Sequence, residues 1–112
     1  MRIRLTTTGA RTGETRATTL YAWEDGDDLI VVGSRGGSAQ DPGWAHNLRA
    51  HPSAHVSTGT LEWQATAEEI GDGTERDRVW AMVVKAFPSY AGFQRRTKRR
   101  IPLFRLRPVL GR

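Results

Sequence analysis

The chain has 112 residues, of which 38% are hydrophobic, so it is long enough for one domain with one core and too short for a second. It has no cysteine, which excludes disulfides, thiol catalysis and zinc–thiolate sites, and no apolar run approaches the roughly 20 residues of a membrane span. A net charge of +5 and a pI near 10.7 predict an anionic partner, which could be nucleic acid, anionic lipid or a phosphorylated cofactor. The first residues lead into strand-like sequence rather than a signal peptide, so we expect a cytoplasmic protein.

The N-terminal third of the chain predicts three strands joined by tight turns. Basic or polar residues alternate with apolar or β-branched ones directly after Met1, which is typical of a half-buried strand. A glycine-bounded polar turn then brings Arg11 and Arg16 together beside a second strand. The following D-G-D turn signal makes an apolar third strand return antiparallel to the second. The expected strands are residues 2–8, 17–24 and 29–33.

A glycine-rich loop and a helix follow the third strand. The loop begins S-R-G-G at Ser34; its two glycines allow a tight turn, and Arg35 can grip an anion in forked geometry. Asp41 is expected to cap the helix, with Pro42 at its first position, and the helix ends at His51. A strand, a loop with a cation and a helix N-terminus can seat a phosphate-bearing ligand, although an ordinary surface loop has the same pattern.

The C-terminal half predicts three more strands and one or two helices. Asp72 and Glu75 resemble a capping box at the start of a helix with one apolar face. Aromatic residues then recur every third position, at Phe87, Tyr90 and Phe93. The expected strands are residues 54–58, 61–70 and 101–106, with Pro102 restricting the last to a sheet edge or to a strand start.

The predicted elements favour a mainly β, α+β fold. About six short strands, mostly linked by hairpins, alternate with two or three helices. Too few strands precede crossover helices for a doubly wound α/β architecture. We therefore predict a single domain over residues 1–112, built as a small antiparallel barrel or strongly bent sheet with helices packed at its mouth.

Cations in the turns are the main candidates for ligand binding. If the second and third strands pair, Arg11, Arg16 and Arg35 lie near one end of the barrel and form an anion pocket; the alternative is that all three are simply solvated. The histidines at 46, 51 and 55 lack metal-ligand spacing, so no metal is expected. Ser34 lies outside any G-x-S-x-G nucleophile motif.

Two further features leave alternatives open. The run Q-R-R-T-K-R-R at 94–100 is the strongest argument for nucleic acid. Against it, the run also fits a solvated surface, and neither an RNP-like aromatic signature nor a G-x-x-G clamp accompanies it. The aromatic residues are either core residues or ligand contacts. Among them Tyr21 and Tyr90 are the better functional candidates, because a hydroxyl can donate a hydrogen bond or a proton.

Separated motifs recur in order along nearly the whole chain. They are L-T-T-T-G at 5–9, R-T-G-x-x-R at 11–16, S-R-G-G at 34–37, D-P-G-W-A-H-N-L-R-A-H-P at 41–52, P-S-Y at 88–90 and I-P at 101–102. Together they resemble the deazaflavin-dependent nitroreductase family, the actinobacterial quinone reductases that use coenzyme F-420.

This resemblance implies a split β-barrel of the flavin-reductase type and hydride transfer from reduced coenzyme F-420 to a quinone or nitro compound. The coenzyme's phosphate and acidic tail would lie on Arg11, Thr12, Gly13 and Arg16, with Ser34, Arg35, Gly36 and Gly37 completing the cradle. The channel beside the deazaflavin would be lined by Trp44, Asn47 and Leu48. The reacting edge, where the substrate enters, would be faced by Tyr21, Ser34 and Tyr90.

Some positions depart from the family pattern. Ala10 stands where a second basic residue is common, and Phe87 and Phe93 stand where some members have tyrosine. The family usually has a further N-terminal segment, which is linked to membrane association. We therefore expect either a truncated start or a more open pocket. Peripheral membrane contact is the alternative to a purely cytoplasmic location. FMN is the alternative cofactor. A non-catalytic flavin, deazaflavin or haem carrier and a basic nucleic-acid-binding barrel are the alternative functions.

Overall fold

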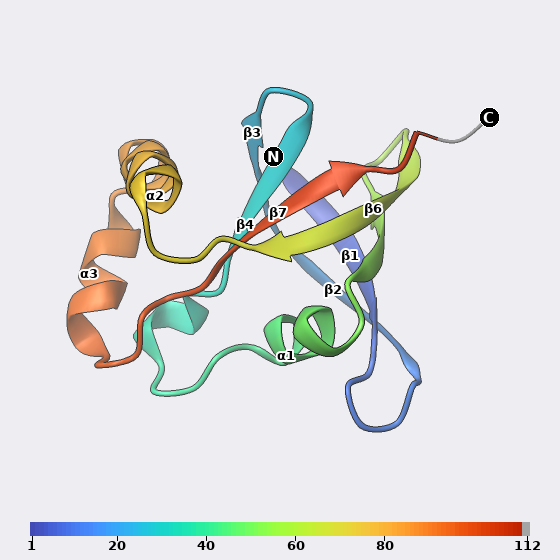
Figure 1. Cartoon of the computed structure of the whole chain (residues 1–112), viewed down its shortest axis with the longest axis horizontal. Coiled ribbons are helices and arrows are strands. Elements are labelled where there is room, and N and C mark those ends of the chain that lie inside the picture. The colour runs from blue at the N-terminus through green and yellow to red at the C-terminus, as the bar shows by residue number, and fades with distance from the viewer. Residues whose placement is uncertain (111–112) are drawn as a thin grey trace.

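A computed structural model describes residues 1–110 and is built on one seven-stranded sheet (Figure 1). The strands are β1 (Arg2–Thr8), β2 (Thr15–Tyr21), β3 (Trp23–Asp25), β4 (Asp28–Val32), β5 (Ser53–Ser57), β6 (Glu62–Glu69) and β7 (Leu103–Pro108). Their order in the sheet is β2-β1-β5-β6-β7-β4-β3, and every neighbouring pair is antiparallel. The antiparallel architecture predicted from the sequence is confirmed.

The sheet curls into a half-barrel because its two edge strands are consecutive in the chain. Only Ala22 separates β2 from β3; this residue is fully buried, and its N–H donates to the carbonyl oxygen of Met1 at 2.7 Å. The strand expected over 17–24 is therefore divided, since its first part pairs with β1 and its second with β4. This division makes seven strands where the sequence predicts about six.

Alternating side chains build a core on each face of β4. Leu29 and Val31 point into the half-barrel, while Ile30 and Val32 point toward the helices that cover its outer side. The remaining buried residues of the inner core come mainly from the other strands and are Ile3, Leu5, Ala22, Ala45, Leu48, Ala54, Val56, Ala65, Ala67, Phe104 and Leu106. A continuous apolar run is what a strand buried on both faces requires.

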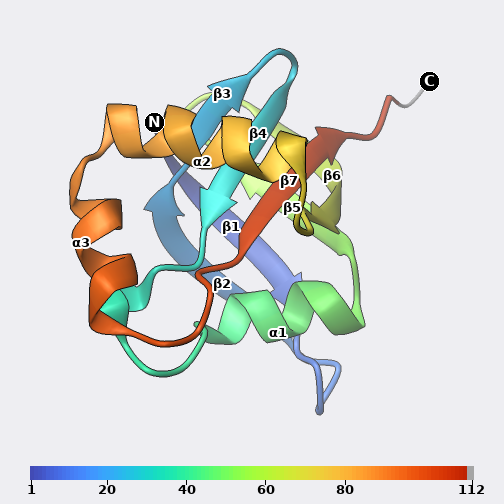
Figure 2. The same ribbon diagram turned by 60° about the vertical axis from the view of Figure 1, so that its left-hand side comes forward.

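Three α-helices flank the sheet: α1 (Gly43–Ala50), α2 (Thr74–Ala86) and α3 (Ser89–Arg96), with a 3-10 turn, η1 (Arg35–Gly37), before α1. Helix α1 lies at one end of the half-barrel, where Ala45 and Leu48 join the inner core (Figure 1). Figure 2 shows α2 crossing β4 and β7, and Val79 and Val83 of this helix pack on the outer face of those strands. Within residues 1–110 no helix has the length and hydrophobicity that a membrane crossing needs, since α2, with 13 residues, is the longest.

Two predicted helix caps are wrong, and the cause is the same in both cases. Helix α1 begins at Gly43 after Pro42, and α2 begins at Thr74 after Gly73, each without a side-chain cap hydrogen bond. The carboxylate of Asp41 is bound instead by two arginines, and that of Asp72 pairs with Arg100. In both cases arginines of α1 or of the segment after α3 pair with the carboxylate, so its oxygens do not bond the first N–H groups of the helix.

Strand β7 begins one residue after Pro102. Of the two predicted alternatives, the proline therefore precedes the start of the strand and does not place the strand at a sheet edge. Strand β7 lies between β6 and β4 in the middle of the sheet. The carbonyl oxygen of Pro102 accepts a hydrogen bond from the N–H of Gly33 at 2.9 Å, which ties the end of β4 to the beginning of β7. The proline can precede a central strand because its missing N–H falls outside the β-ladder.

Candidate functional site

A groove runs from the β1–β2 turn, past the start of α1, to a group of aromatic residues. It consists of three hollows of about 810, 690 and 240 Å³. The first and second share Arg16 and Asn47, and the second and third share Arg35 and Trp44. The shared walls make the hollows one elongated site, long enough to hold a ligand with chemically different ends.

The first end of the groove is cationic. Arg11 and Thr12 line it from the β1–β2 turn, Arg16 from the start of β2, and His46 and Arg49 from α1. The tight turn predicted from the two glycines is present, because the N–H of Gly9 donates to Glu14 and the N–H of Gly13 donates back to Gly9. This arrangement brings Arg11 and Arg16 to one side of the molecule, as the sequence predicts.

Asn47 fastens the turn to the helix. Its Oδ1 accepts a hydrogen bond from the N–H of Ala10 at 2.9 Å, and its Nδ2 donates to Oγ1 of Thr7 at 3.1 Å. Both ends of the amide are therefore bound by β1 and the turn that follows it, across about forty residues of sequence. Asn47 lines the groove, and it also sets the distance between the cations beside the turn and those of α1.

The segment between β4 and α1 forms the middle of the groove. Arg35 and Gly36 have φ angles of 45° and 62°, and Gly37 has 86°, so three successive residues adopt left-handed conformations that favour glycine. A Cβ on Gly37 would lie 2.9 Å from the carbonyl oxygen of Phe93, so this glycine allows the segment to approach α3. Arg35 lines the groove, whereas Gly36 and Gly37 do not line any of the three hollows.

The other end of the groove is aromatic and carries hydroxyl groups. The 240 Å³ hollow brings together Tyr21, Ser34 and Tyr90, the three residues predicted at the reacting edge, and it is also lined by Trp44 and Phe87. Tyr21 is 54% exposed, whereas Tyr90 is 6% exposed. The two tyrosines thus differ in environment: one can move at the mouth of the hollow, and the other is held by packing.

Packing and one hydrogen bond hold Tyr90 in place. Its ring lies edge-on to Phe87, with ring centres 4.8 Å apart, and edge-on to Trp23 at 6.2 Å. The indole Nε1 of Trp23 donates to the Tyr90 hydroxyl oxygen at 3.0 Å. Burial raises the pKa of Tyr90, and the hydrogen bond from Trp23 only partly opposes that rise. The hydroxyl therefore keeps its proton at neutral pH and, because its oxygen already accepts a bond, can donate that proton toward the hollow.

The structure separates the predicted site residues into two groups. Those that line the groove are Arg11, Thr12, Arg16, Tyr21, Ser34, Arg35, Trp44, Asn47 and Tyr90. Leu48, expected in the channel, is 2% exposed and belongs to the inner core, because it lies on the opposite side of α1 from the groove. Gly13 shapes the turn without lining a hollow.

Sequence reasoning missed two groove residues of α1 that carry polar or charged side chains. His46 lines both large hollows, and Arg49 lines the cationic end. A signal for His46 was present: it falls on the helical stripe of Gly43, Asn47 and Ala50, which all line the cationic hollow. No comparable local pattern marks Arg49.

The histidines and the basic run are arranged differently from a metal site or a uniformly solvated surface. Within residues 1–110 no three histidine, aspartate or glutamate side chains are close enough to hold a metal ion, and His55 pairs with Glu62 at 2.7 Å. In the run at 94–100, Arg99 is bound internally, Arg100 pairs with Asp72, and the Gln94 side chain bonds backbone groups of the same run and of the residue after it. Much of this run therefore connects α3 to β7.

Comparisons with known proteins agree with the fold and with the motif order. The family profile described as F420H(2)-dependent quinone reductase matches residues 2–108. An F420H(2)-dependent quinone reductase of Mycobacterium tuberculosis is 37% identical over 101 residues, which cover 88% of this chain and 68% of that protein.

Solved structures extend the comparison to the fold. A structure titled as an F420-H2 dependent reductase has a TM-score of 0.83 and 36% identity, covering 94% of this chain and 92% of that one. The heme storage protein from Vibrio cholerae has a TM-score of 0.74 over 98% of this chain and 82% of that one, but only 18% identity, so it shares the fold alone. The half-barrel is the split barrel that the motif resemblance implies, and the chain belongs to the F420H(2)-dependent quinone reductase family.

Proposed function

We propose that this protein binds reduced coenzyme F-420 in the groove and catalyses hydride transfer from it to a quinone. The observation that carries the proposal is the chemical polarity of the groove, which has arginines at one end and aromatic rings with hydroxyl donors at the other. A coenzyme with a phosphate and an acidic tail at one end and a flat ring at the other matches that polarity. Membership of the family supports the same assignment.

The residues present fit the coenzyme. Arg11, Arg16 and Arg35 would hold the phosphate and the acidic tail, since guanidinium groups bind such anions in forked geometry. Trp44, whose ring lies between the cationic and aromatic hollows, would flank the deazaflavin, and Thr12 adds a hydroxyl at the tail end. When bound, the reduced deazaflavin supplies the hydride; the protein supplies position and electrostatics.

The aromatic end would receive the acceptor. The exposed rings of Tyr21 and Phe87 offer flat apolar surfaces to a planar quinone, and Tyr90 lies beneath them with a protonated hydroxyl. Hydride arrival gives the quinone two electrons and one hydrogen, and negative charge builds on an oxygen that must take up one proton. A donor aimed at that oxygen stabilises the transition state more than the ground state, and Tyr90 has this role, with Ser34 and Tyr21 orienting the acceptor.

The test is titration of the protein with coenzyme F-420 and, separately, with FMN, followed by anaerobic mixing of the reduced complex with a quinone or a nitroarene. We expect tighter binding of coenzyme F-420 than of FMN, and oxidation by the quinone in repeated turnovers. Binding without oxidation by either acceptor would make the protein a carrier. Oxidation by the nitroarene alone would replace the acceptor class, and no binding of coenzyme F-420 would reject the proposal.

A further inference from the structure

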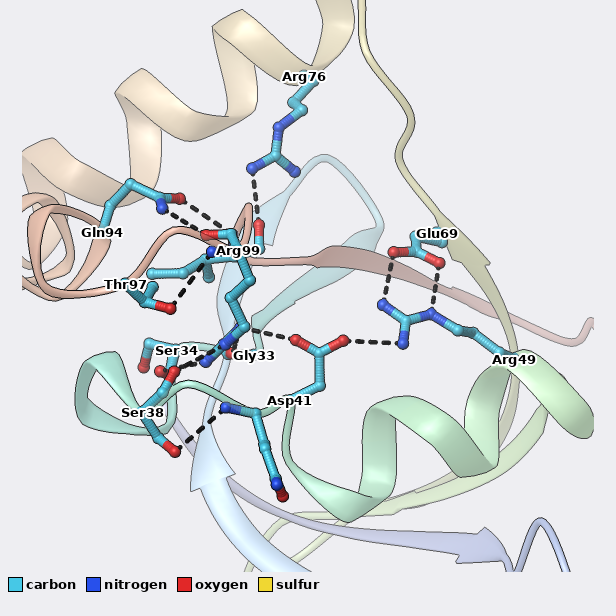
Figure 3. A network of polar contacts seen from close by, with 12 residues as sticks. Gly33, Ser34, Ser38, Asp41, Arg49, Glu69, Arg76, Gln94, Thr97 and Arg99 are labelled. Atoms are coloured by element: carbon cyan, nitrogen blue, oxygen red, sulfur yellow. Dashed lines mark hydrogen bonds and ion pairs between the residues drawn. The ribbon is translucent and has the colours of Figure 1, made fainter.

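Arg99 makes an unusually complete set of contacts for a residue in a surface-facing basic run. Its guanidinium donates to the backbone oxygens of Gly33 at 3.1 Å, Ser34 at 2.8 Å and Ser38 at 2.8 Å, and to Oδ1 of Asp41 at 2.7 Å (Figure 3). Only 14% of the side chain is exposed. These four hydrogen bonds use most of the five N–H donors of the guanidinium group, so little capacity is left for an outside ligand.

All four acceptors belong to the segment that joins β4 to α1, residues 33–42. This segment carries Ser34 and Arg35 on the groove wall, and it contains the three successive left-handed residues described above. Glycine adopts such a conformation freely, but Arg35, at φ 45°, keeps it only where surrounding contacts hold it. Within the segment, the N–H of Gly37 donates to the Ser34 carbonyl oxygen and that of Ser38 to the Arg35 carbonyl oxygen; Arg99 binds the same Ser34 oxygen and, in addition, that of Ser38.

Arg99 is itself fixed in place. The Gln94 side chain donates to the Arg99 carbonyl oxygen at 2.8 Å and accepts from the N–H of Ile101 at 2.9 Å, so α3 holds the backbone from Arg99 to Ile101. Ile101 is fully buried in the outer core. The guanidinium thus extends from a rigid base, which is a requirement for a side chain that positions others.

Arg99 also compensates a negative charge at the groove. Asp41 lines the middle hollow beside Arg16 and Arg35, where an unpaired carboxylate would repel a phosphate. Arg99 binds one of its oxygens, and Arg49 binds the other at 2.8 Å; Arg49 is bound in turn by both oxygens of Glu69 (Figure 3). Both guanidinium groups offset the charge of Asp41, and of the two only Arg99 does so without lining the groove.

From these contacts we infer that Arg99 is a positioning residue for the coenzyme site. It lines none of the three hollows. It acts through the 33–42 segment, by holding Ser34 and Arg35 at the groove and by compensating Asp41. This inference rests on the proposed function, because the ligand that Ser34 and Arg35 would meet is the coenzyme.

The experiment compares Arg99→Gln and Arg99→Lys with the matched control Arg105→Gln. Arg105 is 5% exposed and pairs with Asp25, Asp28 and Glu75, but it lies outside the groove. We expect Arg99→Gln to raise the Kd for coenzyme F-420 about tenfold, and Arg99→Lys to raise it less, because an ammonium keeps the charge but not the fork. The control should lose thermal stability to a similar degree with its Kd unchanged.

Two further readouts separate positioning from a general loss of stability. In a double-mutant cycle, Arg99→Gln should raise the Kd by threefold or less when Arg35 is already alanine, because the groove cation that Arg99 positions is gone. Without any coenzyme, trypsin should cut after the exposed Arg35 several-fold faster in Arg99→Gln than in the parent or in the Arg105→Gln control, since the segment is no longer held.

The outcomes distinguish the two proposals. If the parent binds the coenzyme and Arg99→Gln binds it equally well, the inference is overturned and the proposed function stands. If the parent binds no coenzyme, both the proposed function and the coenzyme role of Arg99 are overturned, even where cleavage after Arg35 accelerates. An unchanged rate of cleavage after Arg35 in Arg99→Gln contradicts the positioning role, whatever Kd is measured for the coenzyme.

Discussion

Tyr90 and Tyr21 line the same hollow, but their surroundings differ, and we expect them to have different roles. The Tyr90 hydroxyl is buried and accepts a hydrogen bond from Trp23, so its direction and its protonation are both set by the protein. Tyr21 is 54% exposed, and its ring lies 6.3 Å from that of Trp23, where it can adapt to an acceptor. A fixed donor is the better transition-state stabiliser because it needs no reorganisation during the reaction.

We therefore predict that Tyr90→Phe lowers the rate of quinone reduction about tenfold or more, which corresponds to about 1.4 kcal/mol of barrier, while the Kd for the coenzyme stays nearly constant. Stopped-flow oxidation of the reduced coenzyme at matched occupancy measures this rate. Tyr21→Phe is the control and should change it less than threefold. Since Tyr90→Phe leaves the Trp23 N–H unpaired, about 1 kcal/mol of stability should also be lost. Equal rates for parent and Tyr90→Phe would make Tyr90 a core residue only.

The raised pKa of Tyr90 predicts how the reaction depends on pH. A tyrosine is neutral when protonated, and burial moves its pKa above the ordinary value of 10.0, so the donor form is complete below pH 10. Stability contributed by the neutral form is likewise present below pH 10 and is lost as pH rises through the folded-state pKa. We expect no loss of rate from this group below pH 10 and a falling limb above it. The pH–rate profile of Tyr90→Phe should lack that limb, and a limb centred well below pH 10 in the parent would contradict the assignment.

At the scale of elements, α1 has two faces with separate tasks. One face, with His46 and Asn47, lines the groove, and the other, with Ala45 and Leu48, closes the inner core. The N–H of Ala10 and the hydroxyl of Thr7 bind Asn47, so the helix also anchors the β1–β2 turn. Core packing and groove lining are therefore divided between opposite faces of the same helix.

This division predicts opposite effects for two neighbouring substitutions in α1. Leu48→Ala should lower the free energy of unfolding by about 2–5 kcal/mol, because it removes a buried side chain from a closed core, and should change the Kd for the coenzyme less than threefold. His46→Ala, at an exposed position on the groove face, should raise the Kd severalfold with little change in stability. Urea unfolding and coenzyme titration measure the two quantities. A large increase in the Kd of a folded Leu48→Ala variant would mean that Leu48 lines the coenzyme channel, as the motif resemblance implies.

At the scale of the molecule, a positive net charge is distributed unevenly over the barrel. Arg11, Arg16 and Arg35 gather at the groove, whereas Arg2 and Arg4 lie exposed on β1 and line none of the three hollows. All of these arginines contribute to the general field that attracts anions, but only those at the groove can contact a bound one. Local and long-range contributions can therefore be separated by mutation.

We predict that Arg16→Ala raises the Kd for the coenzyme about tenfold at low salt, since a charge-assisted contact is lost, whereas Arg4→Ala, with the same change in net charge, raises it less than twofold. Added salt should weaken binding by the parent more than by Arg16→Ala, because screening acts on a contact that the variant lacks. Titrations of the three proteins at two ionic strengths test this. Equal effects of both substitutions would mean that net charge alone attracts the coenzyme.

Much of this protein could be predicted from local sequence patterns. Alternation of period two predicts most of the strands, because side chains on a pleated strand point to opposite faces whatever the rest of the chain does. The glycine-bounded turn with Arg11 and Arg16, and the D-G-D hairpin, depend on backbone conformations that only nearby residues control. The order of the motifs identified the family, and the residue types of the groove followed from them.

Only the tertiary structure decided features that depend on partners far apart in the chain. The division of one expected strand at Ala22 follows from closure of the sheet, in which its two halves pair with different strands. Asp41 caps no helix because Arg99, 58 residues away, is brought against it, and the same contact makes Arg99 part of the groove's support rather than of a basic surface. Local patterns specify periodicity and turns, but ion pairs and burial depend on where the curled sheet places segments that the sequence keeps apart.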